Sequence, residues 1–460
     1  MENFWDYSVW GSINLVAVLL ASMLVANMIK RSVPFLKVSL IPTSVLGGSL
    51  LLIIAVIYKA ITNEFMFDAP FFGGNGSKTL EVITYHSLAL GFIATAFKPN
   101  KEKLTKKRNI EIFDTGVTTV ATYLIQGILG MSISLLAVYF VKDFFPAAGI
   151  LLPFGYGQGT GQALNWGGIY EMDYNFVGGK SFGLTIAAFG FLSASIGGVI
   201  HLNILKKKNV IAIDSEEGTS ALDTGDVQGD DEIPMNGSMD KVSVQMAFVF
   251  SAYIIAYLII YVLGNLVPSL KSILYGFNFL FGVLIAVLFN SVVAALRRKK
   301  LINRQYINTF LMNRISGFFF DIMIVAGIAA IRIDVLENYW VIIIIMGLTG
   351  AFLTYYYVYF VCKKLFKDYP EQQFLAMYGM LTGTASTGMI LLREVDKEFK
   401  SPVSENLVYQ NLPAIVFGFP MMLIAALAPK EPMLTFLILI GFFIVMNLIL
   451  FRSFIFKKKN

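Results

Sequence analysis

Long runs of apolar residues alternate with short polar segments along most of this chain. Most of the runs reach the roughly 20 residues that an α-helix needs to cross the hydrocarbon core of a bilayer. The pattern therefore predicts an all-α polytopic membrane protein. We expect spans at residues 10–29, 38–58, 80–97, 112–141, 181–205, 242–264, 273–296, 307–331, 339–362, 405–428 and 432–451.

Two glycine-rich segments interrupt this pattern. Residues 153–168 read PFGYGQGTGQALNWGG, and residues 379–388 read GMLTGTASTG. Glycine destabilises a helix interior by about 1 kcal/mol relative to alanine, and a backbone group freed from a helix costs several kcal/mol in hydrocarbon, so such segments at membrane depth are buried in protein or line a wet cavity. A pair of interrupted segments in corresponding halves of a chain is typical of a transporter's binding site.

Two other interpretations of the glycines stay open. Small residues at close spacing also permit tight helix packing, and for one segment alone that explanation is as good as a binding site. The run from Gly157 to Gly161 also resembles a phosphate-binding loop. That motif requires a preceding strand and a following helix in a soluble domain, which the pattern does not show.

The distribution of basic residues predicts the topology. If each glycine-rich segment is a re-entrant hairpin, one side of the membrane holds the segments 30–37, 98–108, 206–241, 297–305, 363–369 with 393–400, and 452–460. Every strong Lys/Arg cluster falls within them. The positive-inside rule places that side in the cytoplasm, with the N-terminus outside and the C-terminus inside. Each half then has an odd number of spans, so the halves form inverted repeats.

The predicted domains follow from this count. The first inverted repeat covers residues 1–205, with five transmembrane helices and a hairpin at about 147–175. An acidic cytoplasmic linker covers 206–241, where nine acidic residues and few large hydrophobic ones predict disorder. The second repeat covers 242–428, with five helices and a hairpin at about 370–395. One extra transmembrane helix and a basic tail cover 429–460.

Composition narrows the function classes. Cys362 is the single cysteine, and His86 and His201 are the only histidines, so clustered Cys or His ligands for a resident metal are excluded. The mean hydropathy of +0.69 fits an integral membrane protein, and the net charge of +6 arises at helix ends, so no nucleic-acid partner is implied. We expect no enzymatic activity and no cofactor.

Several motifs resemble the sodium/glutamate symporter family of bacterial inner membranes. The run 157–161, GQGTG, is similar to that family's first hairpin motif, and residues 379–388 with the preceding KDYP at 367–370 are similar to its second. Residues 32–37, SVPFLK, and the Gly47-Gly48 pair resemble its first two spans. Tyr156, Leu381 and Ser386 depart from the family pattern, which bears on glutamate more than on sodium coupling.

The resemblance implies a sodium-coupled symporter for glutamate or a related small amino acid or carboxylate in the cell (inner) membrane. It implies a homodimer, with Na⁺ as the coupling ion, and a core domain holding both hairpins that moves against a scaffold in an elevator-like manner. The expected partners are thus a small-molecule substrate, Na⁺ and the lipid bilayer.

The hairpins supply the candidate ligands. Side-chain amides donate and accept hydrogen bonds, which suits an amino acid or carboxylate. Hard cations such as Na⁺ take oxygen ligands. The sequence does not fix which oxygens bind Na⁺. For any single amide, a structural hydrogen bond is an equal alternative. The candidate substrate-binding residues are Gln158, Gly159, Thr160, Gly161, Gln162, Asn165, Gly383, Thr384, Ser386 and Thr387, and the candidate cation ligands are Thr160, Thr382, Thr384 and Asp321.

Asp321 and Arg314 are charged residues inside a predicted span. Intramembrane charges are functional candidates by default. Their seven-residue separation puts them on one helical face about 10 Å apart, too far for direct pairing without long side-chain reach. We expect Arg314 to extend toward the lipid headgroups and Asp321 to bind a cation or a partner.

Three further function classes are weighed against a sodium symporter. An ion channel predicts a ring of pore-lining charges or a carbonyl filter, and an intramembrane enzyme predicts a catalytic constellation within the spans; the sequence carries neither pattern. A proton-coupled transporter of another organic anion stays open, because the sequence does not fix the coupling ion.

Overall fold

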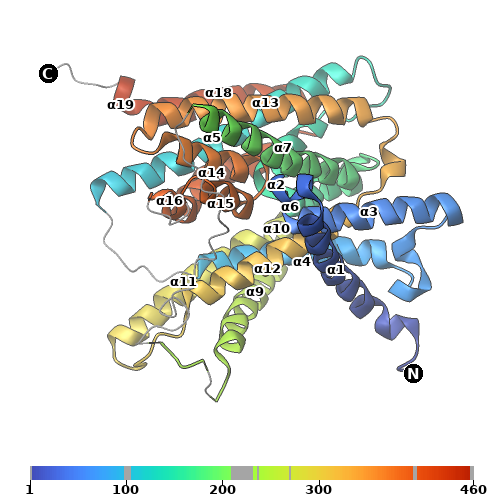
Figure 1. The fold of residues 1–460 in the computed structure, drawn as a ribbon, viewed down its shortest axis with the longest axis horizontal. Helices are drawn as coiled ribbons and strands as arrows, with labels where there is room; N and C mark the ends of the chain where they lie inside the picture. Colours follow the sequence, from blue (N-terminus) through green and yellow to red (C-terminus); the bar gives the residue numbers. More distant parts are fainter. Residues whose placement is uncertain are drawn as a thin grey trace. The chain divides into compact units, whose positions relative to one another are not determined.

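The described residues fold mostly into α-helices (Figure 1). The computed structural model describes residues 3–97, 105–208, 232–235, 238–268, 271–396 and 401–455. Among these, nine helices are long and apolar enough to cross a bilayer, and a pair bent by 48°, Val403–Tyr409 with Pro413–Leu427, makes a tenth if it is one span. The prediction of an all-α multi-pass membrane protein is confirmed at this level.

Most predicted spans match single helices, but three differ. The span expected at 273–296 begins in a separate short helix, Lys271–Gly276, and continues in the helix Asn278–Arg298. The span expected at 80–97 forms a helix, α4 (Gly76–Ala96), which is not among the helices apolar enough to cross. His86 and two buried hydroxyls, Thr84 and Ser87, lower its apolar character. The span expected at 405–428 is broken into α16 (Val403–Tyr409) and α17 (Asn411–Leu427).

The chain divides into two compact units, and each combines segments from both halves of the sequence. The first unit is Met1–Glu81, Leu104–Ile213 and Ile324–Asn460, and the second is Val82–Lys103 and Asp214–Met323. Within the first unit the helices are α1 (Tyr7–Ser32), α2 (Pro34–Val38), α3 (Thr43–Thr62), η1 (Met66–Asp68), η2 (Pro70–Phe72), α5 (Lys106–Ala137), η3 (Ala148–Ile150), α6 (Leu151–Tyr174), α7 (Gly179–Lys207), η5 (Ile333–Leu336), α13 (Trp340–Leu365), α14 (Pro370–Thr382), α15 (Ala385–Arg393), α16, α17, α18 (Pro432–Leu450) and α19 (Arg452–Ile455).

The second unit has its own apolar core. It contains α9 (Lys241–Leu266), α10 (Lys271–Gly276) and α11 (Asn278–Arg298), with most of α4 and of α12 (Thr309–Ala329). Close packing between α4 and α12 explains why residue 91 is a glycine, because a Cβ on Gly91 would lie 2.6 Å from the Phe320 ring of α12. The core residues are Leu90, Ile93, Ala94, Phe97, Val249, Ala252, Ile285, Ala286, Ile307, Met312, Ile315 and Phe319.

The predicted linker at 206–241 is packed at its end. The ammonium of Lys241 is fully buried and lies 2.7 Å from Glu232, whose carboxylate also accepts a hydrogen bond from Asn308 at 2.7 Å. A buried ion pair therefore holds these last residues of the predicted linker in place. Residues 209–231 and 236–237 lie outside the described residues.

The extra C-terminal helix α18 packs along α5 in the first unit, where Figure 1 shows α5, α7, α13 and α18 side by side. A Cβ on Gly127 of α5 would lie 3.5 Å from Leu439 of α18. Just beyond α18, the Arg452 guanidinium donates a hydrogen bond of 2.6 Å to the Asp114 carboxylate of α5. Asp114 thus has a specific partner in the segment that follows α18.

Candidate functional site

The first glycine-rich segment is a helical hairpin. Helix α6 is interrupted at Gly159, which has φ 79° and ψ −173°, a conformation that favours glycine. The ring of Phe154, before the break, stacks on that of Trp166, after it, with centroids 5.3 Å apart. Twelve residues of straight helix would separate them by about 18 Å. The chain therefore reverses at Gly159, and the two arms lie antiparallel.

Backbone-to-backbone contact holds the second arm of this hairpin against α7. A Cβ on Gly167 would lie 2.3 Å from the carbonyl oxygen of Gly179, and one on Gly183 would lie 2.5 Å from that of Ala163. Any larger residue would force the helices apart. These glycines therefore serve the packing role that was one interpretation of the sequence, while Gly159 provides the reversal.

The second glycine-rich segment is also a helical hairpin. Its arms are α14 and α15, joined at Gly383 and Thr384. The arms touch through glycine, since a Cβ on Gly379 would lie 2.8 Å from the Cα of Gly388. Thr384 caps α15: its hydroxyl accepts a hydrogen bond from the N–H of Thr387 at 3.4 Å. Such a cap fixes the start of a helix.

The two hairpins begin at opposite ends of α5 and α7. At the base of the first, the Ser134 hydroxyl near the end of α5 donates to the carbonyl of Pro146 at 2.7 Å. At the base of the second, Lys107 at the start of α5 pairs with Asp368 at 2.7 Å. The hairpins consequently point toward each other along the same helices.

The hairpin tips meet at the middle of α7. A Cβ on Gly190 would lie 2.3 Å from the carbonyl oxygen of Thr382 in the second hairpin and 3.3 Å from the Cα of Tyr156 in the first. Both tips thus come within van der Waals distance of one glycine, which explains why no side chain stands there.

Helix α5 forms hydrogen bonds to both hairpin tips through two residues one helical turn apart, Tyr123 and Gln126. The hydroxyl of Tyr123 donates to the carbonyl of Gly157 at 3.1 Å. The amide nitrogen of Gln126 donates to the carbonyl of Leu381 and to the hydroxyl of Thr354, each at 2.9 Å. Carbonyls that interrupted helices leave without a backbone donor are thereby satisfied by side chains.

The candidate residues lie on the two hairpins whose tips meet, and they differ in exposure. Thr160 is fully buried against α12, where a Cβ on Gly327 would lie 2.8 Å from its own Cβ. The Thr382 hydroxyl donates to the carbonyl of Tyr378 at 2.7 Å. The side chain of Ser386 lies outside the described residues. Buried candidates are Gly159, Gly161, Gln162, Gly383 and Thr387, and half-buried ones are Gln158, Asn165 and Thr384.

Two buried polar side chains on one face of the first hairpin lack hydrogen-bond partners among the described residues. Neither the nitrogen nor the oxygen of the Gln162 amide has a partner, nor does the indole N–H of Trp166. Both side chains are 1% exposed and stand one helical turn apart. An unsatisfied buried donor or acceptor costs about 1–3 kcal/mol. A ligand with matching polar groups would remove that cost.

Asp321 and Arg314 both lie on α12 in the second unit, and both side chains are exposed. The guanidinium carbon of Arg314 lies 5.0 Å from the centroid of the Phe310 ring, a cation–π contact. The assignment of Asp321 as a cation ligand stays a prediction.

Sequence reasoning missed a buried polar face on α5. The amide nitrogen of Gln373 in the second hairpin donates to Thr115 at 3.2 Å, and the Thr119 hydroxyl donates to Gln410 of the α16–α17 break at 3.0 Å. The signal was a helical repeat of polar residues inside an apolar span. This face consists of Thr115, Thr118, Thr119, Thr122 and Gln126, all at most 1% exposed.

A cavity of about 980 Å³ opens at the base of the first hairpin, not at its tip. Its aromatic lining closes the base, with the rings of Phe145 and Phe176 stacked at 4.7 Å. Lys142 and Asp143 also line this cavity, whereas none of the candidate ligands does. The converging tips therefore remain the better candidate site.

Neither a scan against protein-family models nor a search of curated proteins finds a match to this sequence. In the described part of the chain, no group of three or more His, Cys, Asp or Glu side chains is placed to hold a metal ion.

Proposed function

We propose that the protein is a sodium-coupled secondary transporter, a symporter, that takes up glutamate or a related small amino acid or carboxylate. One observation carries the proposal: two opposed helical hairpins meet tip to tip at Gly190. Interrupted helices whose ends converge near the midplane are the usual binding site of transporters with inverted repeats.

The helix ends at the tips match the expected ligands. At each tip one arm ends and another begins, so partial negative and partial positive charges face the same space. The N-termini that begin at Thr160 and Ala385 suit a substrate carboxylate. The hydroxyls of Thr382 and Thr384, with carbonyl oxygens at the end of the arm that ends there, suit Na⁺.

The membrane arrangement is part of the same proposal. Each hairpin re-enters the bilayer from its own side, because their bases lie at opposite ends of α5 and α7. The halves are inverted repeats, the N-terminus lies outside and the C-terminus in the cytoplasm of a cell (inner) membrane. The unit with both hairpins serves as the moving core, the other as scaffold, in a homodimer.

Uptake into proteoliposomes tests the proposal. Radiolabelled L-glutamate, L-aspartate, other amino acids and dicarboxylates are offered with an inward Na⁺ gradient, with a proton gradient, and with neither. We expect one of the amino acids or carboxylates to accumulate with Na⁺ alone. Accumulation that depends only on the proton gradient would contradict sodium coupling, and equilibration without accumulation would indicate a channel.

A variant and its control connect uptake to the site. Gln162→Leu removes the amide without a partner at the first tip, so the substrate affinity falls while the protein folds. Thr435→Val is the matched control, because Thr435 on α18 is fully buried and its hydroxyl also lacks a partner among the described residues. It should leave uptake unchanged.

A further inference from the structure

A buried histidine links α7 to the base of the second hairpin. His201, 2% exposed, lies between two partners. Its Nε2 is 2.8 Å from the Glu371 carboxylate in the first turn of α14, and its Nδ1 is 2.7 Å from the Tyr355 hydroxyl of α13. The imidazole thus joins three helices at one point, and the proposed transport site at the tips does not use it.

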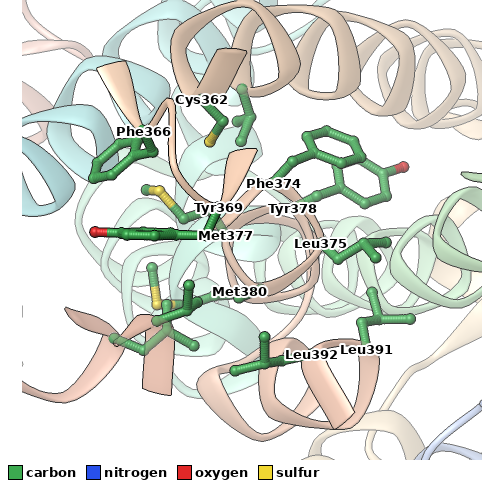
Figure 2. Packing of buried hydrophobic residues seen from close by; sticks show 14 of the residues in the cluster. Cys362, Phe366, Tyr369, Phe374, Leu375, Met377, Tyr378, Met380, Leu391 and Leu392 are labelled. Carbon is green, nitrogen blue, oxygen red and sulfur yellow. The ribbon is translucent and has the colours of Figure 1, made fainter. Parts of the chain in front are cut away.

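The surroundings hold this histidine in place and supply a counter-charge. The other carboxylate oxygen of Glu371 pairs with the Lys363 ammonium at 2.5 Å. The ring of Phe374 lies 4.4 Å from that of His201, and Figure 2 shows Phe374 and Tyr378 in the apolar cluster below Cys362. The titratable or charged groups that the packed helices contribute around it are Tyr355, Tyr359, Cys362 and Lys363 from α13, and Glu371 and Tyr378 from α14.

Both protonation states of the imidazole fit this geometry. In the neutral state Nε2–H donates to Glu371 and the Tyr355 hydroxyl donates to Nδ1. In the protonated state both ring N–H groups donate, so the Tyr355 oxygen accepts. The bond to the carboxylate then becomes an ion pair, and charge-assisted hydrogen bonds are roughly twice as strong as neutral ones.

We propose that His201 is a proton-binding site, and that proton binding ties the second hairpin more tightly to α7. Histidine is the side chain whose ordinary titration falls between about pH 5 and pH 8. A proton taken up there adds a positive charge between Glu371 and Tyr355 and opposes separation of α14 from α7. The opening of the hairpin base therefore slows as the pH falls, whatever the transported substrate is.

The single cysteine reports this opening. Cys362 is fully buried in the same cluster, so a maleimide reaches its thiol only when the base opens. N-ethylmaleimide labelling rates are measured on the full-length protein between about pH 5 and about pH 8. Dividing each wild-type rate by that of His201→Gln at the same pH cancels the pH dependence of the thiol. We expect the ratio to fall severalfold from the alkaline to the acid limit.

The other histidine supplies the control. His86 of α4 also pairs with a tyrosine, its Nδ1 lying 2.6 Å from the Tyr253 hydroxyl in the second unit. The variant His86→Gln should keep the wild-type pH response. A wild-type ratio that does not change with pH, or a response that disappears in His86→Gln, would overturn the proposal.

A conservative variant keeps the test valid if His201→Gln does not fold. Tyr355→Phe preserves the ring and removes the oxygen that accepts from the imidazolium. Protonation then becomes less favourable, so the midpoint of the labelling profile, relative to the wild type, moves to lower pH. An unshifted midpoint would overturn the proposal that the proton binds at His201.

Discussion

The two hairpins have the same architecture and satisfy their polar groups differently. In the second, the Thr382 hydroxyl donates to a carbonyl of its own arm and Thr384 caps the next arm. In the first, the Gln162 amide and the Trp166 indole are buried without partners among the described residues. In the proposed transporter this difference would divide the two ligands between the tips, with side chains of the first tip binding the substrate and oxygens of the second binding the cation.

The bases differ as well. The first hairpin is anchored by stacked aromatic rings and by contact between the backbones of Gly167 and Gly179. The second is anchored by charges, through Lys107–Asp368 and His201–Glu371. If His201 binds a proton as proposed, the second hairpin responds to pH through a contact that the first hairpin lacks.

The largest expected effect comes from separating the two tips. In Gly190→Leu a side chain would have to occupy the place where Thr382 and Tyr156 already meet, and even its Cβ would clash. Overpacking of this kind costs about 1–3 kcal/mol or more. We expect Na⁺-driven uptake to be lost in proteoliposomes.

A matched glycine shows whether that loss is specific. Gly441 lies on α18 with no atom within 4 Å of an added Cβ, so Gly441→Leu should preserve uptake. Equal loss of uptake in both variants would mean that any added side-chain bulk in the membrane segments disrupts the protein. The contact of the two tips at Gly190 would then not be specifically required for transport.

The next effect concerns the first tip. Gln162→Leu removes two buried polar atoms that a substrate would satisfy, at about 0.5–1.5 kcal/mol for each neutral hydrogen bond. We expect the substrate Kd to rise roughly tenfold, with an unchanged or higher Tm because a buried unsatisfied amide disappears. Isothermal calorimetry and thermal unfolding check the two quantities. A lower Tm with unchanged affinity would make Gln162 a structural residue.

A substitution at the second tip should change the Na⁺ dependence of uptake. Thr384→Val removes a hydroxyl that caps α15 and faces the proposed Na⁺ site. We expect the Na⁺ concentration for half-maximal uptake to rise severalfold, with the substrate affinity restored at saturating Na⁺, because the two ligands are reciprocally coupled. If the Na⁺ dependence of uptake does not move, the hydroxyl only caps the helix.

We expect the smallest effect from a substitution at the exposed ion pair Lys107–Asp368, at the base of the second hairpin. The Lys107 ammonium, hydrogen-bonded to Asp368, lowers the pKa of this carboxyl below its usual value. A lowered folded-state pKa stabilises the protein above the unfolded-state pKa, and this contribution is lost as the pH falls through the folded value. Both side chains are about two-thirds exposed, so we expect Asp368→Asn to leave Tm at neutral pH and physiological salt unchanged. A clear drop in Tm would show that this pair, and not His201, holds the base.

The sequence predicted the helices and the two interruptions well, because both depend on local composition. Apolar runs of sufficient length identify spans, and glycine at 159 and 383 marks a place where a helix stops. The exception, α4, shows the limit of that rule: its polar residues reduce its hydropathy without preventing a helix.

The partners within the site could not be predicted, since they come from distant parts of the chain. Gly190 is ordinary within its apolar span, yet it separates the tips of hairpins that begin on either side of it in the sequence. The contact between His201 and Glu371 joins residues 170 apart. Likewise, that Gln162 lacks a partner while Thr382 has one depends on the packing of neighbouring helices, not on the motifs themselves.

The most direct test of the account is a double-mutant cycle across the two tips. Substrate Kd is measured at subsaturating Na⁺ for the wild type, Gln162→Leu, Thr384→Val and the double variant, with the substrate that the uptake panel identifies. If the tips form one site, the two changes are not additive, and the coupling energy exceeds about 0.5 kcal/mol. Additive losses within that limit, or no loss in either variant, would contradict a shared site between the hairpins.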